Sequence, residues 1–81
     1  MTQEELRRIV DEALGNVAPE ADLSALADSA ELRMDLDIDS IGFLEFITEL
    51  HEKLGIDIPE IDYPRLVTRG DVLGYLMPKL G

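Results

Sequence analysis

The sequence has no cysteine and no tryptophan, and its aromatic residues are two phenylalanines, two tyrosines and one histidine. Without cysteine the chain has no disulfide, no thiolate nucleophile and no thiolate ligand for a metal. The single histidine, His51, excludes a histidine pair and a zinc set built on several histidines. We interpret His51 as a solvated surface residue, and Tyr63 and Tyr75 as core rings whose hydroxyls contact water.

Basic residues are also few. The chain has seven Lys and Arg and eighteen Asp and Glu, so its net charge is −11. A small domain with this charge repels nucleic acid and anionic membrane surfaces, so neither is expected as a partner. Proteins with basic surfaces are favoured instead.

Long hydrophobic runs are absent, so no segment is predicted to span a bilayer. The first residues, Met1 to Glu5, are acidic where a signal peptide would be basic, and a cytoplasmic location is expected. Eighty-one residues are expected to form one monomeric domain, residues 1–81. A domain of this size has room for one modest core and no deep catalytic cleft. These properties predict a carrier or adaptor and not an enzyme.

Hydrophobic periodicity predicts an all-α fold, a small four-helix bundle with three main helices and one short helix. The first helix starts at a capping box formed by Thr2 and Glu5 and stops at Gly15. Residues 16–38 have no sustained periodicity and are predicted to form a long loop, with one helical turn near Leu23 to Ala27.

The second predicted helix runs from Ser40 to about Leu54, and Gly55 closes it. Its core stripe at helical spacing consists of Phe43, Phe46, Ile47, Leu50 and Leu54. A second, smaller apolar patch lies to one side of that stripe and is bordered by acids; it consists of Ile41, Leu44 and Thr48, with Glu45, Glu49 and Glu52 around it.

The remaining segments are shorter. Residues 56–59 are predicted to be an extended connector, because Pro59 disfavours a strand. Residues 62–66 are predicted to form one short helical turn capped by Asp62. Thr68 and Asp71 repeat the capping pattern and open the last helix.

Ser40 is the candidate functional residue, because it lies where an acidic loop meets the second predicted helix. The simplest structural role for a serine in this place is a helix cap. The other two serines, Ser24 and Ser29, lie in the long loop with no helix start behind them, and we interpret them as turn residues.

A calcium site is the main alternative at this position. Asp35, Asp37 and Asp39 occupy the first, third and fifth places of an EF-hand loop. The later places fail, because a glycine and a bidentate glutamate are required where the chain has Ser40 and Phe46. We expect no specific metal site, although weak divalent binding by the three aspartates is predicted.

Several linked features resemble acyl carrier proteins, from the first helix to Leu76. They are Asp39-Ser40-Ile41 at a helix start, the apolar stripe that follows, Gly55 before Ile56-Asp57-Ile58-Pro59, and Thr68 to Asp71 at the last helix. The resemblance implies a four-helix bundle in which Ser40 is esterified to 4′-phosphopantetheine donated by coenzyme A. A thiol on that arm would supply the sulfur that a chain without cysteine lacks.

The resemblance also implies partners and their docking residues. The partners would be a phosphopantetheinyl transferase and acyl-loading, acyl-transfer or condensing enzymes with basic docking surfaces. Asp39 is assigned to transferase recognition or helix capping, because its charge would repel the phosphate. The implied docking residues are Ile41, Leu44, Glu45, Thr48 and Glu52.

Three positions depart from the family pattern, Gly42, Thr48 and His51, and make the docking surface less acidic than usual. They favour a specialised carrier that holds acyl thioesters in fatty acid, polyketide or related biosynthesis. Phe43 and Phe46 narrow the interior that a long acyl chain would occupy. The alternatives are an aminoacyl or peptidyl carrier and, in a different class, an acidic divalent-binding or protein-interaction module.

Overall fold

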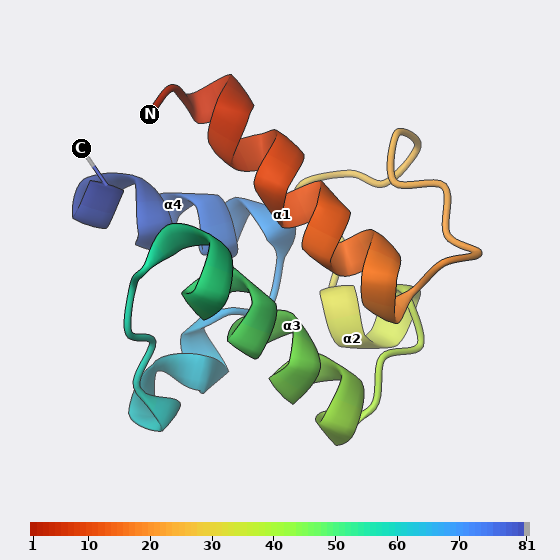
Figure 1. Cartoon of the computed structure of the whole chain (residues 1–81). Coiled ribbons are helices and arrows are strands. Elements are labelled where there is room, and N and C mark those ends of the chain that lie inside the picture. Colours follow the sequence, from red (N-terminus) through yellow and green to blue (C-terminus); the bar gives the residue numbers. More distant parts are fainter. Residues whose placement is uncertain (81) are drawn as a thin grey trace.

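The computed structural model describes residues 1–80, which form four α-helices and one 3₁₀ helix (Figure 1). These are α1 (Gln3–Val17), α2 (Leu32–Asp35), α3 (Ser40–Leu54), η1 (Glu60–Arg65) and α4 (Arg69–Leu80). In this part of the chain there is no strand, only an isolated antiparallel bridge between Glu31 and Thr68. The predicted all-α class is confirmed. None of the described helices is long and apolar enough to cross a membrane.

Helix α1 begins as predicted and ends later than predicted. The Thr2 hydroxyl accepts from the Glu5 N–H at 3.1 Å, and the Glu5 carboxylate accepts from the Thr2 N–H at 3.3 Å, so the capping box is confirmed. The predicted stop at Gly15 is wrong, because the helix continues through this glycine to Val17. It ends at Ala18. Because Ala18 precedes Pro19, a steric clash with the proline ring disfavours the helical conformation at this residue.

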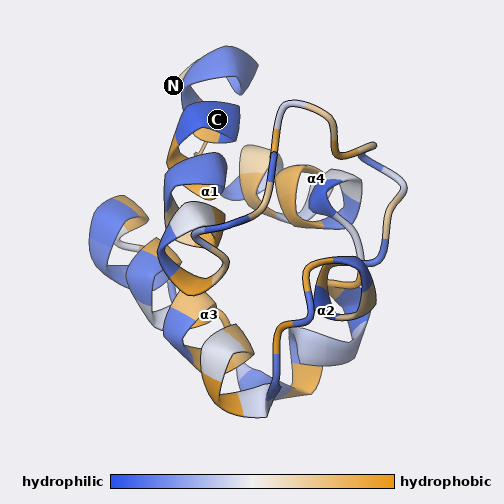
Figure 2. Cartoon of the chain, turned by 90° about the vertical axis from the view of Figure 1, so that its right-hand side faces the viewer, coloured by the Kyte–Doolittle hydropathy of each residue, from blue (hydrophilic) through white to orange (hydrophobic). Residues whose placement is uncertain are grey.

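The core lies among α1, α3 and α4. Helix α1 packs against both α3 and α4. Hydrophobic and hydrophilic stretches alternate along these helices, as expected for amphipathic segments (Figure 2). The predicted core stripe of α3 is confirmed: Phe43, Phe46, Ile47 and Leu50 are buried, and Leu54 is partly buried against them. The remaining core residues come mainly from the inner faces of the other two helices, Leu6, Val10, Ala13 and Leu14 on α1 and Val72, Leu73 and Leu76 on α4.

The segment between α1 and α3 differs from the predicted long loop because it contains α2. This helix has only four residues and no side-chain cap, so it leaves no periodic signal in the sequence. The predicted helical turn near Leu23 is instead a pair of tight turns, in which the N–H groups of Ala25 and Leu26 donate to carbonyls three residues earlier.

A buried arginine, Arg69, ties this segment to the helices. Only 4% of Arg69 is exposed. Its guanidinium donates to Asp28 at 2.8 Å, to Asp11 at 2.9 Å and to the backbone carbonyls of Leu23 and Leu26. The pKa of Asp28 lies well below its usual value because hydrogen bonds from Arg7 and Arg69 stabilise the carboxylate. The loop is therefore ordered around one charge, which the sequence analysis did not identify.

The connector at residues 56–59 is extended, as predicted, and Ile58 is buried in the core. The 3₁₀ helix η1 starts two residues earlier than predicted, and Pro59, not Asp62, is its N-terminal flanking residue. Asp62 instead accepts a hydrogen bond of 2.6 Å from the Tyr75 hydroxyl. The sequence predicted that this hydroxyl contacts water, whereas in the structure it bonds to a carboxylate. This bond and burial raise the pKa of Tyr75.

Helix α4 opens with the predicted reciprocal cap. The Asp71 N–H donates to the Thr68 hydroxyl at 3.0 Å, and the Thr68 N–H donates to the Asp71 carboxylate at 3.1 Å. Gly70 in the first turn approaches the backbone of the loop, because a Cβ placed on it would lie 3.3 Å from the Asp28 carbonyl oxygen. A glycine is a poor helix former, but at this position it permits the loop to pack closely against α4.

Candidate functional site

Ser40 is the first residue of α3, and Asp39 is the residue that caps this helix. The Asp39 carboxylate accepts from the Gly42 N–H at 2.7 Å, so the capping role assigned to Asp39 is confirmed. A Cβ on Gly42 would lie 3.1 Å from Ile38 and 3.2 Å from the Asp39 carboxylate, so the close cap favours glycine here. The simplest role considered for Ser40, that of the cap, is excluded, and its hydroxyl is available for other contacts.

The turn before Ser40 is fixed by its backbone. Asp37 has a positive φ of 53°, a conformation that few residues other than glycine adopt. The turn is closed by the Ile38 N–H, which donates to the Arg33 carbonyl at 2.9 Å, and the Ile38 side chain is buried. The chain is thereby reversed between α2 and α3, and Ser40 is brought beside α2.

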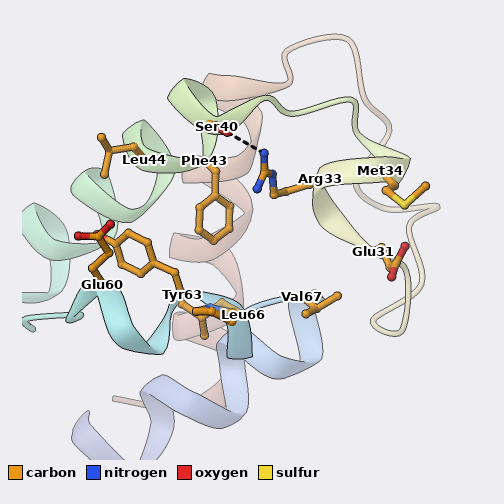
Figure 3. Close-up of a pocket in the computed structure, with 11 residues that line it drawn as sticks. Glu31, Arg33, Met34, Ser40, Phe43, Leu44, Glu60, Tyr63, Leu66 and Val67 are labelled. Atoms are coloured by element: carbon orange, nitrogen blue, oxygen red, sulfur yellow. Dashed lines mark hydrogen bonds between the residues drawn. The ribbon is translucent and has the colours of Figure 1, made fainter.

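The Ser40 hydroxyl accepts a hydrogen bond of 3.0 Å from Nη2 of Arg33, a residue of α2 (Figure 3). The guanidinium carbon of Arg33 also lies 5.8 Å from the centre of the Phe43 ring, within range of a cation–π contact. The sequence analysis missed Arg33. A signal was present, since Arg33 is the one basic residue in the acidic stretch from Glu31 to Ser40.

A groove of about 570 Å³ opens next to Ser40 and is lined by residues of α2, α3, η1 and the segment after η1. Figure 3 shows the rings of Phe43 and Tyr63 at its wall. These rings meet edge to face, with centroids 5.9 Å apart. Most of the lining is apolar, and charged groups stand at its rim: Glu31, Arg33 and Glu60. An apolar surface is therefore continuous with the Ser40 hydroxyl.

The smaller patch predicted on α3 is exposed in the structure. Ile41 and Leu44 are 70% and 52% exposed, and the flanking Glu45 and Glu52 are exposed as well. Together with Thr48 and Glu49 they line a shallow depression. Glu49 differs from its neighbours, because it accepts from Asn16 at 2.8 Å and pairs with Lys53 at 3.2 Å. The Lys53 ammonium donates hydrogen bonds to the carboxylates of Glu12 and Glu49, and these bonds raise its pKa.

Two departures from the family pattern have local structural explanations. The Thr48 hydroxyl donates to the Leu44 carbonyl at 2.9 Å and is satisfied within the helix. His51 lies beyond the patch, where its Nδ1 is 2.9 Å from the Ile56 carbonyl oxygen and 3.3 Å from the Asp57 carboxylate. His51 therefore contacts the connector after α3.

The three aspartates considered as a calcium site do not converge. Asp39 is engaged in capping α3, and Asp35 accepts from the Glu31 N–H at 2.9 Å. Across residues 1–80, no group of three or more Asp, Glu or His side chains is arranged to hold a metal ion. Weak divalent binding at Asp35, Asp37 and Asp39 stays a prediction.

Comparison with known proteins places residues 4–76 in the family described as "Phosphopantetheine attachment site". The chain is similar to an acyl carrier protein of Lactobacillus acidophilus, with 32% identity over 82 residues that cover 100% of both chains. It is also similar to an acyl carrier protein of Thermotoga maritima, with 28% identity over 76 residues, 94% of this chain and 88% of the relative. An acyl carrier protein of Helicobacter pylori is 32% identical over 73 residues, 90% of this chain and 87% of the relative.

Proposed function

Because the chain belongs to the acyl carrier protein family, we propose that Ser40 is the residue that carries its 4′-phosphopantetheine. A member of this family is a carrier and not a catalyst, and its cofactor is 4′-phosphopantetheine attached covalently to a serine. The choice of serine rests on position, since Ser40 alone among the three begins a helix.

The surroundings of Ser40 fit an attached phosphate. Ser40 lies in the first turn of α3, where backbone N–H groups and the helix dipole favour a negative charge. Its oxygen accepts from a cation, Arg33. In contrast, the Ser24 hydroxyl donates to Asp22 at 2.6 Å, and a phosphate there would face a carboxylate. Ser29 lies in the loop before α2 and is not the first residue of a helix.

Attachment requires one ester bond between Ser40 Oγ and the pantetheine phosphorus of coenzyme A. The P–O bond of the coenzyme A diphosphate bridge breaks, the phosphorylated adenosine part leaves with the bridging oxygen, and the Ser40 hydroxyl proton passes to solvent. When bound, the group supplies a terminal thiol that holds cargo as a thioester. This thiol accounts for the ability of a chain without cysteine to act as a thioester carrier.

The exposed patch of α3 is the proposed docking surface for the transferase and for acyl-loading, acyl-transfer or condensing enzymes. Its apolar residues, Ile41 and Leu44, lie directly after Ser40 along the helix. Glu45 and Glu52 are exposed acids that basic partner surfaces would attract. Glu49 contributes less, because its charge is already matched by Lys53.

We assign the cargo to the acyl class, held for fatty acid, polyketide or related specialised biosynthesis. The apolar groove beside Ser40 supports acyl cargo, because it offers hydrocarbon a surface away from water. Gly42, beside Ser40, and Thr48, in the docking patch, depart from the family pattern, and these two departures support a dedicated pathway. We further propose that the chain is one domain, monomeric and cytoplasmic. Loading assays with acyl and aminoacyl donors separate this assignment from an aminoacyl carrier.

The experiment that tests the proposal is intact mass spectrometry after incubation with coenzyme A and a phosphopantetheinyl transferase. The wild-type chain should gain the mass of one phosphopantetheine. Ser40→Ala should gain nothing while remaining helical by circular dichroism, and the matched variants Ser24→Ala and Ser29→Ala should be modified like wild type. Modification that persists in Ser40→Ala would contradict the assignment.

A further inference from the structure

We propose that Arg33 is a positioning residue for the phosphodiester on Ser40, whose guanidinium binds the phosphate and directs the arm along the groove. The inference rests on the proposed function, since it requires attachment at Ser40. It assigns the one cation at the attachment site a role that the similarity to acyl carrier proteins does not supply.

The first observation is distance. Nη2 of Arg33 lies 3.0 Å from Ser40 Oγ, the atom that becomes the ester oxygen. The phosphate oxygens are only two bonds beyond this atom, so they come within reach of a guanidinium that already touches it. Arginine carries five N–H donors in a planar fork and matches the geometry of phosphate oxygens.

The second observation is charge. Among the described residues Arg33 has no carboxylate partner, whereas Arg7, Arg65 and Arg69 each pair with an aspartate. Within residues 1–80 Arg8 also has no ion pair, but it lies on α1, and Arg33 is the unpaired arginine that contacts Ser40. The added phosphodiester brings a further negative charge beside Asp39, and Arg33 is placed to offset it.

The third observation is that Arg33 is held in place before the phosphate arrives. Its backbone carbonyl accepts from the Ile38 N–H at 2.9 Å, and its guanidinium lies over the Phe43 ring at 5.8 Å. Arg33 and Ser40 both line the groove. A phosphate held between them would direct the rest of the arm along the Phe43 wall, so Arg33 acts on the path of the arm as well as on its charge.

The direct test is NMR spectroscopy of the arginine side-chain Nε–H signals in the unmodified and modified wild-type protein. The chain has five arginines, and the Arg33 signal is identified by its loss in unmodified Arg33→Gln. On modification the chemical shift of the Arg33 Nε–H should change, and its line should become narrower because the proton exchanges more slowly with water. The Arg8 signal should stay in place. An Arg33 signal at the same position in both forms would overturn the proposal.

Modified variants then test the path of the arm. Nuclear Overhauser contacts between the Phe43 ring and the pantetheine protons next to the phosphate should appear in wild type. They should be lost in Arg33→Gln, retained in part in Arg33→Lys, and unchanged in Arg8→Gln, which removes an equal charge from an exposed position on α1. Contacts of wild-type strength in Arg33→Gln would contradict the proposal.

The two proposals fail separately. Wild-type protein that gains no mass on Ser40 refutes the proposed function, and with it the role of Arg33. Wild-type protein that is modified on Ser40 without a change at Arg33 refutes the role of Arg33 alone.

Discussion

Two arginines of this chain, Arg69 and Arg33, have the same side chain and opposite surroundings. Arg69 is buried, and its guanidinium bonds to two aspartates and two backbone carbonyls. Arg33 is exposed, lacks a carboxylate partner among the described residues and donates to the Ser40 hydroxyl. The donors of Arg69 are used to hold the fold, whereas Arg33 keeps donors free for a ligand.

The same division runs along α3. Phe46 is buried, as Arg69 is. Leu44 is exposed, as Ser40 and Arg33 are. The chain thus separates a region that maintains the fold from a region that meets partners. Substitutions in the first region should change stability, and substitutions in the second should change modification and docking.

The largest effect is expected at Phe46, which is fully buried. Phe46→Ala should lower the free energy of unfolding by about 3 to 5 kcal/mol, because it removes a large core side chain and leaves a cavity. Leu44→Ala should change it little. Urea denaturation measures both. If Leu44→Ala unfolds the protein while Phe46→Ala leaves it stable, the separation of the two faces is wrong.

Arg69→Met should lower the free energy of unfolding by about 3 kcal/mol, because it removes the buried donor that Asp11, Asp28 and two loop carbonyls share and leaves Asp28 with Arg7 alone. Hydrogen exchange should show the loop between α1 and α2 opening first. Arg33→Met serves as the matched control and should keep nearly wild-type stability. Equal losses in the two variants would remove the distinction between the arginines.

A smaller effect is expected from Asp28, whose pKa is lowered by Arg7 and Arg69. Its ionised form is favoured in the fold, so its contribution is complete above the unfolded pKa, near 4, and is lost as the pH falls through the lower folded pKa. Asp28→Asn should lower the stability at pH 7 by about 1 kcal/mol, given its partial exposure. It should also flatten the loss of stability below pH 4, as measured by thermal melting at several pH values.

The smallest effect on stability is expected on the docking patch. Glu45→Lys should leave the melting temperature nearly unchanged and slow modification by the transferase, because it repels a basic docking surface. The defect should shrink as added salt screens the wild-type attraction. Glu4→Lys, an equal charge change at the far end of α1, is the control. Equal slowing by both variants would indicate a general charge effect and no docking surface at Glu45.

Sequence reasoning predicted the features whose causes are local. The caps at Thr2 with Glu5 and at Thr68 with Asp71 involve residues three apart, and the core stripe of α3 follows from helical periodicity. It missed Arg69, because its aspartate partners lie 41 and 58 residues away and only the fold brings them together. It missed α2, because four uncapped residues carry no periodic pattern.

At the candidate site, the sequence predicted the position of Ser40 at a helix start and the exposed patch beside it. The Arg33 contact depends on the turn at Asp37, where a positive φ brings α2 back to Ser40. In the sequence Gly42 is a small residue beside Ser40 that departs from the family pattern, and its relation to the Asp39 cap is not evident there. In the structure it admits the Asp39 cap, because a larger side chain would crowd Ile38 and the carboxylate.

The most direct test of the account is fragmentation mass spectrometry of peptides from the modified wild-type protein, which locates the attached group on one residue. The phosphopantetheine should lie on Ser40 in every modified peptide. Fragments that place the group on Ser24 or Ser29, or a protein that the transferase leaves unmodified, would contradict it.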